Sequence, residues 1–365
     1  MKLILGDRSV ELTEAYVFGT GSFALEISKL LSQHGVLVKG FLCSDSSFIR
    51  TDHEYPTTLI SEFLDINTPI VIGIFNHYDD VISIARVLEV KGVQEIYFPG
   101  QIIVNLRTPF SKYYLTCSKE DLPSRTEIEI VNSLLQDEIS RSILKRFVMY
   151  QLGNSDGLIQ DSEVPQRQYL GESLPTSVKD EYFSGLNRIV DVGAYDGDTV
   201  RNFCDRLKVY DRAMEFICIE PDQKNFEKLK YGTANLNAKV LKLNTAVGDS
   251  NGWIPFTHDG GLSSSALSDN NVLMNVPQFK LDDLLIDWSP TLIKMDIEGA
   301  ELSALRGSMK LLKSGASNFS ISVYHQPKDI VSIPLYVYSL NNSYRFFLRT
   351  YGQHNYDTIL YCVKS

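Results

Sequence analysis

The chain has 365 residues, of which 44% are apolar and 22% charged, and this is the composition of a folded globular protein long enough for two domains. Its 45 acidic residues outnumber its 35 basic ones, and the formal net charge of −10 argues against nucleic acid as a partner, because phosphate binding needs a basic surface. No apolar run approaches the roughly 18 residues of a membrane helix, no signal-peptide pattern opens the chain, and the five cysteines form no CxxC pair. Reduced thiols and a cytoplasmic location are therefore expected.

The first part of the chain alternates between strand and helix patterns. Short apolar runs predict strands, and stretches with apolar residues three or four apart predict helices. This alternation predicts a small, doubly wound, Rossmann-like α/β domain over residues 1–107. The expected strands are 16–18, 36–42, 70–75 and 92–98, and the expected helices are 22–32 and 81–90.

A glycine loop joins the first of these strands to the first helix. It reads Gly19-x-Gly21-x-x-Ala24, and Asp45 follows about two dozen residues later, as in a dinucleotide-binding fingerprint. The unit also resembles the small Rossmann-like domains attached to sugar-modifying acyltransferases, which bind nucleotide sugars. Three interpretations stay open: a nucleotide or nucleotide sugar, a dinucleotide such as NAD, and a structural or dimerising role that would make the protein a homodimer.

Residues 108–180 have a different pattern. One apolar stripe at helical spacing predicts a single connecting helix, and the polar, proline-bearing stretch 156–175 predicts an irregular loop that packs onto the next domain. The stripe consists of Ile128, Val131, Leu135, Ile139, Ile143 and Phe147.

The remainder, residues 181–365, again alternates regularly. Five apolar runs, each followed by a helix or an insertion, predict five parallel strands, and two closing strands without a helix between them predict an antiparallel pair. This is the layout of a seven-stranded, doubly wound sheet. The expected strands are 188–194, 216–220, 240–247, 292–296, 319–325, 344–350 and 358–363, the helices are 198–208, 222–233, 300–313 and 327–340, and the insertion is 248–277.

The loop after the first strand of this half is rich in acidic residues. Asp191, Asp196 and Asp198 surround Gly193 and Gly197, whose missing side chains allow a ligand to approach the backbone. Three carboxylates would repel a phosphate, so the loop suits a ligand that is cationic or rich in hydroxyls. S-adenosylmethionine (SAM), with its sulfonium, ammonium and ribose hydroxyl groups, is such a ligand.

A second acidic residue, Glu220, ends the next strand, 29 residues after Asp191. In open parallel sheets the ligand lies beyond the carboxyl ends of the strands, so this carboxylate is expected to accept hydrogen bonds from both ribose hydroxyls. The alternative is that Glu220 only caps the helix that begins near Asp222.

The segment Thr291-Leu-Ile-Lys-Met-Asp-Ile-Glu-Gly-Ala-Glu301 resembles the hallmark of the FkbM family of SAM-dependent methyltransferases. The resemblance extends to 191–199, 219–222, 246–249 and 322–325, and it spans roughly residues 181–365. It implies SAM as the cofactor, held on the methionine and ribose side by the Asp191 loop. By analogy with other class I enzymes, the adenine wall is expected at Asn244 to Ala246. The cofactor-binding residues predicted in this way are Asp191, Gly193, Ala194, Tyr195, Asp196, Thr199, Glu220, Pro221, Thr245, Ala246 and Asp296.

The hallmark also supplies candidate catalytic residues. Lys294, Asp296 and Glu298 occupy alternate positions, so in strand geometry they share one face, either touching SAM and the acceptor or forming a structural ion network. His325 ends the fifth strand, and its ordinary pKa of about 6.5 suits a proton acceptor, although it could instead only close the strand. Asp296 is the second candidate base. No clustered ligand spacing predicts a metal, but Asp296 and His325 are kept as an alternative pair of ligands for a divalent ion.

The sequence thus predicts a class I methyltransferase domain preceded by a smaller Rossmann-like domain. The expected reaction is O-methylation by in-line transfer from SAM to a hydroxyl of a small acceptor, a sugar or a secondary metabolite. Two alternatives come from other classes: a SAM-binding or regulatory protein without catalysis, and an NAD-dependent oxidoreductase that works through the N-terminal glycine loop. The serine-rich tip 260–265 of the insertion is expected to be either an acceptor-binding lid or a flexible hairpin tip.

Overall fold

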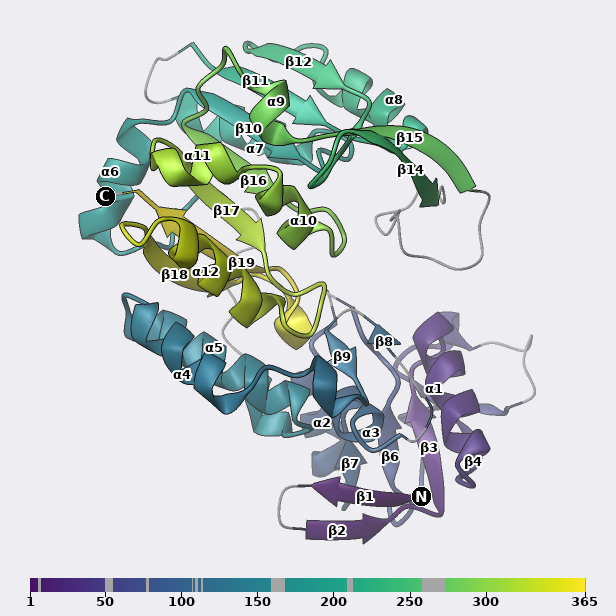
Figure 1. Cartoon of the computed structure of the whole chain (residues 1–365). Coiled ribbons are helices and arrows are strands. Elements are labelled where there is room, and N and C mark those ends of the chain that lie inside the picture. The colour runs from purple at the N-terminus through teal and green to yellow at the C-terminus, as the bar shows by residue number, and fades with distance from the viewer. Residues whose placement is uncertain are drawn as a thin grey trace. The chain divides into compact units, whose positions relative to one another are not determined.

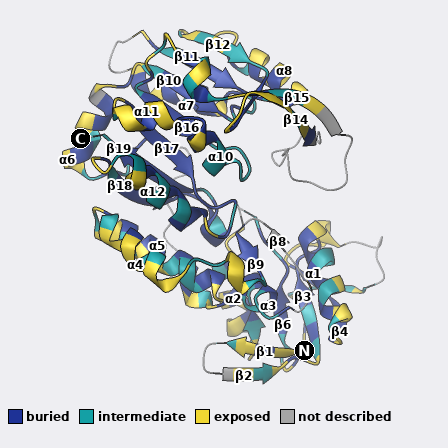
Figure 2. Cartoon of the chain, viewed as in Figure 1, coloured by how far each residue is buried: buried dark blue, intermediate teal, exposed yellow. Residues whose placement is uncertain are grey.

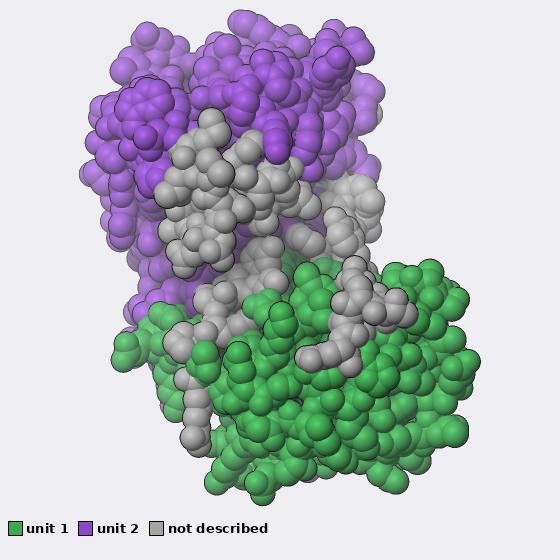
Figure 3. Space-filling view, turned by 90° about the vertical axis from the view of Figure 1, so that its right-hand side faces the viewer, with its two compact units in different colours: residues 1–122, 143–162, 352–356 green, residues 123–142, 163–351, 357–365 purple. Residues whose placement is uncertain are grey.

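The computed structural model describes residues 1–5, 8–49, 55–76, 79–106, 108, 111–112, 114–158, 168–208, 213–257 and 273–364. The chain divides into two compact units, which Figure 3 colours separately. Unit 1 comprises 1–122, 143–162 and 352–356, and unit 2 comprises 123–142, 163–351 and 357–365. The domain boundaries expected from the sequence stay a prediction.

Unit 1 is built on a five-stranded parallel sheet (Figure 1). The strand order is β5-β4-β3-β6-β7, and the alternation of strands and helices expected for this part of the chain is present. β6 is completely buried, as its unbroken apolar run indicates, and the second half of β4 is buried as well. The elements are β3 (Glu14–Phe18), α1 (Ser22–Gln33), β4 (Leu37–Cys43), β5 (Thr57–Leu59), β6 (Ile70–Ile72), α2 (Val81–Val90), β7 (Ile96–Tyr97) and α3 (Pro99–Ile103).

Two small hairpins add to unit 1. An antiparallel pair, β1 (Lys2–Leu5) and β2 (Arg8–Glu11), precedes the sheet, and a second pair, β8 (Ser111–Lys112) and β9 (Leu115–Thr116), follows it. The sequence patterns predicted neither pair, because each strand is too short to show a period.

A loop from near the end of the chain completes the core of unit 1. His354 is fully buried there, its Nδ1 lies 3.0 Å from the Tyr150 hydroxyl, and its ring packs 5.0 Å from that of Phe75. Burial lowers the pKa of His354 to about 3, so the ring is neutral.

The helical stripe of the connector forms two helices, not the single helix expected. α4 (Arg125–Leu134) and α5 (Glu138–Gln151) are separated by a break at residues 135–137. At this break Gln136 donates its backbone N–H to the carbonyl of Phe346, and Asp137 pairs with the buried Arg349 at 2.7 Å. Hydrogen bonds to residues far away in the sequence thus replace helical ones here, although the helical spacing of apolar residues continues through the break.

Unit 2 contains the seven-stranded sheet that the sequence predicts, in the order β12-β11-β10-β16-β17-β19-β18 (Figure 1). The first five strands are parallel, and β19 lies antiparallel between β17 and β18. This strand order is that of the class I methyltransferase fold, and the strands are buried apart from the edge strand β12, which is partly exposed (Figure 2). The strands are β10 (Arg188–Val192), β11 (Glu215–Ile219), β12 (Lys239–Leu243), β16 (Leu292–Met295), β17 (Asn318–Ser322), β18 (Arg345–Thr350) and β19 (Thr358–Val363).

Besides α4, seven α-helices accompany these strands within the described part of unit 2. They are α6 (Thr176–Ser184), α7 (Asp198–Leu207), α8 (Gln223–Gly232), α9 (Leu281–Leu284), α10 (Glu301–Arg306), α11 (Met309–Ser314) and α12 (Asp329–Leu340). The single helix expected over 300–313 is wrong, because Gly307 and Ser308 separate α10 from α11. The backbone carbonyl of Gly248 approaches Gly307 so closely that a β-carbon would lie 2.0 Å from it.

The third strand expected over 240–247 is also split. β12 ends at Leu243, and β13 (Ala246–Val247) pairs instead with β15 (Leu273–Phe279) in a separate three-stranded sheet with β14 (Gly252–Thr257). The intervening Asn244 and Thr245 bond to the carbonyls of Glu220 and Pro277, which turns the chain out of the main sheet. The predicted tip 260–265 lies outside the described residues. Among the helices that the structure describes, none is both long and apolar enough to span a membrane.

Candidate functional site

The centre of the site is a buried ion pair between neighbouring strands. β10 and β16 pair in a register that sets Asp191 opposite Lys294, and their charged atoms lie 2.9 Å apart with both side chains at most 3% exposed. Burial raises the pKa of Asp191 to about 6, although Lys294 opposes this rise. Burial acts to lower the pKa of Lys294, but the carboxylates of Asp191 and Asp296 outweigh it, so the lysine stays charged. Lys294 also donates to the Gly193 carbonyl at 2.7 Å.

The loop after β10 passes directly beside the end of β16. Gly193 has a φ of +78°, and a β-carbon there would lie 1.8 Å from the carbonyl oxygen of Asp296. Only glycine fits this position. Tyr195 also has a positive φ, 45°, which a non-glycine residue holds only when the surrounding structure enforces it.

The rest of this loop forms a tight turn into α7, as expected. Asp196 accepts the backbone N–H of Asp198 and pairs with Arg201 at 3.0 Å. Thr199 is buried and donates its backbone N–H to Asp198. Asp196 and Asp198 therefore hold the turn itself, while Ala194 is buried beneath it.

Glu220 follows β11, the strand next to β10. One of its oxygens accepts the backbone N–H of Tyr195 and the other that of Asp222, each at 2.9 Å. The cap of α8 is Asp222, whose side chain accepts from Lys224 and Asn225, so Glu220 is not the helix cap. Burial raises the pKa of Glu220 to about 7, against the two backbone hydrogen bonds.

The expected adenine wall lies where β12 ends. Asn244 donates to the carbonyls of Glu220 and Pro221, so it ties the two strand ends together. Thr245 and Ala246 are both buried, and the Thr245 hydroxyl is engaged by the Pro277 carbonyl at 2.7 Å. The adenine contacts of these two residues stay a prediction.

Asp296 stands just past β16, with one oxygen held by a tyrosine. The hydroxyl of Tyr169 donates to its Oδ2 at 2.8 Å and lies 3.1 Å from Ser322, which ends β17. Burial opposes ionisation, but the positive charges of His325 and Lys294 hold the pKa of Asp296 below its ordinary value. The hallmark residues do not share one strand face as expected, because β16 ends at Met295.

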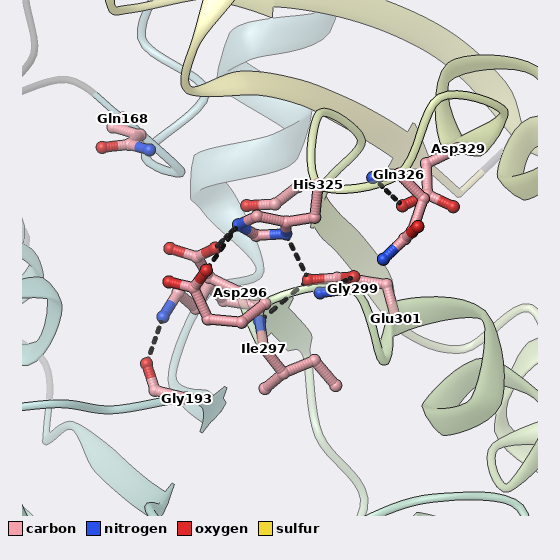
Figure 4. Close-up of polar contacts among 12 residues, drawn as sticks. Gln168, Gly193, Asp296, Ile297, Gly299, Glu301, His325, Gln326 and Asp329 are labelled. Carbon is pink, nitrogen blue, oxygen red and sulfur yellow. Dashed lines mark hydrogen bonds and ion pairs between the residues drawn. The ribbon is translucent and has the colours of Figure 1, made fainter. Parts of the chain in front are cut away.

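His325 lies among three carboxylates (Figure 4). Its Nδ1 lies 2.8 Å from Oε1 of Glu301, and its Nε2 faces Asp296 at 3.4 Å and Glu298 at 3.8 Å. Burial acts to lower its pKa, but Glu301, Glu298 and Asp296 together raise it to about 10. The expectation of an ordinary pKa near 6.5 is wrong, because it left out the neighbouring charges.

Two residues of this cluster received no role from the sequence. Glu301 belongs to the hallmark segment, and its oxygens also accept the backbone N–H groups of Ile297 and Gly299. Tyr169 comes from the irregular segment before α6 and has a positive φ of 64°. The repeated acidic residues of the hallmark were a usable signal for Glu301, whereas no local pattern marks Tyr169.

In unit 1 the glycine loop occupies the position expected of it. Gly21 precedes α1 without a side-chain cap, and nothing lies within 4 Å of where its β-carbon would be. Asp45 follows β4, and its side chain accepts the Ser47 backbone N–H as the cap of a short 3₁₀ turn. A ligand for this loop stays a prediction.

Comparison with known proteins identifies unit 2. Residues 191–353 match the family described as the Methyltransferase FkbM domain. The resemblance that the hallmark segment predicted is therefore confirmed. A comparison with curated proteins finds no significant match.

Among solved structures, the chain is similar to the crystal structure of methyltransferase FkbM from Methylobacillus flagellatus KT. The TM-score is 0.72 at 18% sequence identity, and the match covers 96% of this chain and 90% of that one. At this identity the likeness shows the fold. A SAM-dependent methyltransferase from Leishmania major matches with a TM-score of only 0.31 at 13% identity, over 71% of this chain and 98% of the other, and carries no argument.

Proposed function

Because unit 2 contains an FkbM methyltransferase domain, we propose that this protein transfers a methyl group from SAM to a hydroxyl group of a small acceptor, a sugar or a secondary metabolite. The observation that carries the proposal is the placement of Glu220 beside the Asp191 loop, where neighbouring parallel strands end. The cofactor residues come from the ends of β10, β11 and β12, and the acceptor residues from the ends of β16 and β17.

The arrangement around Glu220 fits the ribose of SAM. A carboxylate has about four acceptor positions, and two are used by the backbone N–H groups of Tyr195 and Asp222. One position on each oxygen is left for the two ribose hydroxyls. The buried Asp191–Lys294 pair holds the adjacent loop in place through the Gly193 carbonyl.

When bound, SAM supplies a methyl group on a positively charged sulfur, which the acceptor oxygen displaces in line. The protein then has to align the acceptor and take up its hydroxyl proton. Of the two candidate bases, Asp296 is the one that accepts the proton, because His325 is already protonated at neutral pH. The low pKa of Asp296 makes it a weak base, so alignment contributes more than proton transfer.

The charges around the acceptor position favour a neutral polyol. The side chains of Asp296 and Glu298 are 27% and 24% exposed, and carboxylates attract hydroxyl donors. A phosphorylated or carboxylated acceptor would meet like charges here and bind poorly.

Calorimetry with SAM, S-adenosylhomocysteine and NAD tests the proposal. Wild-type protein should bind the first two, and Glu220→Ala should weaken both at least tenfold because the ribose hydroxyls lose their acceptor. A matched variant in unit 1, Gly21→Trp, should leave SAM binding unchanged. NAD binding that Gly21→Trp abolishes, with no SAM binding, would instead favour the oxidoreductase.

Labelled methyl transfer to a panel of polyols separates an enzyme from a SAM-binding regulator. A panel of sugars and hydroxylated metabolites should yield a methylated ether for at least one class. SAM binding at full affinity without transfer to any hydroxyl would overturn the catalytic part of the proposal and leave the binding part standing.

A further inference from the structure

His325 follows β17, and its ring lies among three carboxylates that follow the neighbouring strand β16. We propose that Asp296, Glu298 and His325 bind one divalent cation of the Mg²⁺ or Mn²⁺ type, and that Glu301 orients the histidine for it. The role of this cation in methyl transfer rests on the proposed function, whereas the existence of the site does not.

Two buried atoms at this point lack a hydrogen-bond partner among the described residues: Oδ1 of Asp296 and Nε2 of His325. They face each other at 3.4 Å, and the His325 side chain is only 2% exposed. Buried polar atoms without a partner are rare in native proteins, and each calls for an explanation such as a bound water or ion. Both atoms are metal ligands once the cation has displaced the proton from Nε2 of His325, and they face each other.

The third ligand is a carboxylate oxygen that faces the same nitrogen. Oε2 of Glu298 lies 3.8 Å from Nε2 of His325. Adjacent ligands of an octahedral ion with bonds of about 2.1 Å lie about 3 Å apart, so these side chains need to approach by less than an ångström. A set of two carboxylates and one imidazole suits Mn²⁺ or Mg²⁺, with Zn²⁺ as a competitor.

Two residues next to the ligands, Glu301 and Tyr169, form hydrogen bonds that orient Nε2 of His325 and Oδ1 of Asp296 towards the site. Glu301 accepts hydrogen bonds from the backbone N–H groups of Ile297 and Gly299. Its Oε1 also lies 2.8 Å from Nδ1 of His325, and this contact orients the ring so that Nε2 faces the proposed ion. Tyr169 holds Oδ2 of Asp296, which leaves Oδ1 for the ion. A carboxylate behind a histidine is the usual support of a metal-binding imidazole.

A cation at this point would make up for the low pKa of Asp296, which makes this carboxylate a weak base. Asp296, Glu298 and His325 would hold the ion, and the ion would lower the pKa of the acceptor hydroxyl, so that the proton would pass to water and Asp296 would serve as a ligand in place of a base. The carbon–sulfur bond breaks as the carbon–oxygen bond forms, and no oxidant or reductant is needed.

The test is a Mn²⁺ titration of the full-length protein that has first been treated with a chelator. Electron paramagnetic resonance measures the concentration of free Mn²⁺ at each step. About one ion per chain should bind. Asp296→Asn and His325→Gln should each weaken binding at least tenfold, and Glu301→Gln should weaken it by about 10- to 100-fold, as the loss of supporting residues does elsewhere.

Two control variants remove the same residue types away from the site. Glu227→Gln changes an exposed carboxylate of α8, and His34→Gln changes the histidine that ends α1. Both should bind Mn²⁺ as the wild type does. If His325→Gln fails to fold, Asp296→Asn decides, because its amide keeps the hydrogen bond from Tyr169.

The competing explanation is a proton on Nε2 of His325, shared with Asp296. Failure of the wild type to bind Mn²⁺ at millimolar concentration, or equal binding by the site variants, would overturn the metal site and leave this explanation. Calorimetry with SAM on the same samples separates the two proposals. SAM binding without Mn²⁺ binding refutes only the metal site, and Mn²⁺ binding without SAM binding refutes only the proposed function.

Discussion

The carboxyl group of Glu220 should couple SAM affinity to pH. Burial raises its pKa from 4.5 to about 7, although two backbone N–H groups stabilise the charged form. At ~1.4 kcal/mol for each pH unit, the site disfavours the carboxylate by about 3 kcal/mol before any ligand arrives. Ribose hydroxyls donate hydrogen bonds and so bind better to the carboxylate than to the acid. Binding therefore needs the ionised form, whose population falls below about pH 7.

The expected change follows from this population. The apparent dissociation constant is the intrinsic value divided by the ionised fraction, which is about 0.9 at pH 8 and about 0.1 at pH 6. SAM should therefore bind about tenfold more weakly at pH 6 than at pH 8, and about 100-fold more weakly at pH 5. Calorimetry across this range measures it, and Glu220→Gln, which cannot ionise, should bind weakly with a much flatter profile.

The stability of the ligand-free protein should change in the opposite direction. A carboxyl group whose pKa is raised by folding stabilises the protein below its unfolded pKa, and this stabilisation is lost as the pH rises through about 7. Urea unfolding should show up to about 3 kcal/mol of such loss relative to Glu220→Gln. Parallel profiles for the wild type and Glu220→Gln, in affinity and in stability, would refute the reasoning.

Three further predictions concern single side chains elsewhere. Gly193→Ala should abolish SAM binding and lower the melting temperature, because its β-carbon would lie 1.8 Å from a carbonyl of the loop after β16. The control Gly21→Ala has open space around its β-carbon and should change neither. Lys294→Met should cost about 3–5 kcal/mol in urea unfolding, since it leaves Asp191 buried and unpaired, and Asp191→Asn in the same chain should restore much of this loss; no recovery in the double variant would contradict the pairing. Because folding depresses the pKa of His354 to about 3, unit 1 should lose stability as the pH falls from about 6.5 towards 3, by up to about 5 kcal/mol, and amide exchange that shows no such loss relative to His354→Gln would contradict it.

The architecture of unit 2 was accessible from the sequence because most strands of its sheet are buried. Phe216–Ile219 is continuously apolar and is followed by the carboxylate of Glu220, and Ile189–Val192 is apolar apart from Asp191; these patterns mark both the strand and the edge where it stops. The missing helix before β19 also predicted the antiparallel closing pair correctly. These signals are local, so a single sequence carries them.

The errors lie where tertiary contacts override a continuous pattern. The apolar stripe through Leu135 runs on without interruption, yet Gln136 bonds to β18 and divides the helix. The stretch from Val240 to Val247 likewise predicts one strand, yet the side chains of Asn244 and Thr245 turn the chain out of the sheet. In both cases the deciding partner is more than 20 residues away in the sequence, where no window on the local pattern reaches it.

The site shows the same division between local and long-range information. Sequence spacing treated Lys294, Asp296 and Glu298 as one strand face, but the strand ends before Asp296, and Glu298 adopts a positive φ of 55°. The chain thereby turns Glu298 towards His325, a residue that follows a different strand. Spacing along the chain predicts no metal site, because the residues that we propose as ligands follow two different strands.

The order of strands in the sheet could have predicted this cluster, which the spacing of residues along the chain did not. Once the order β10-β16-β17 is accepted, the residues that follow β16 and β17 must lie side by side at one edge of the sheet. Asp296 and Glu301 then become neighbours of His325 by necessity, and a histidine beside three carboxylates cannot keep a pKa near 6.5. Candidate sites in sheets of this kind are therefore better sought by grouping the residues that follow adjacent strands, with charges counted together, than by ligand spacing within one segment.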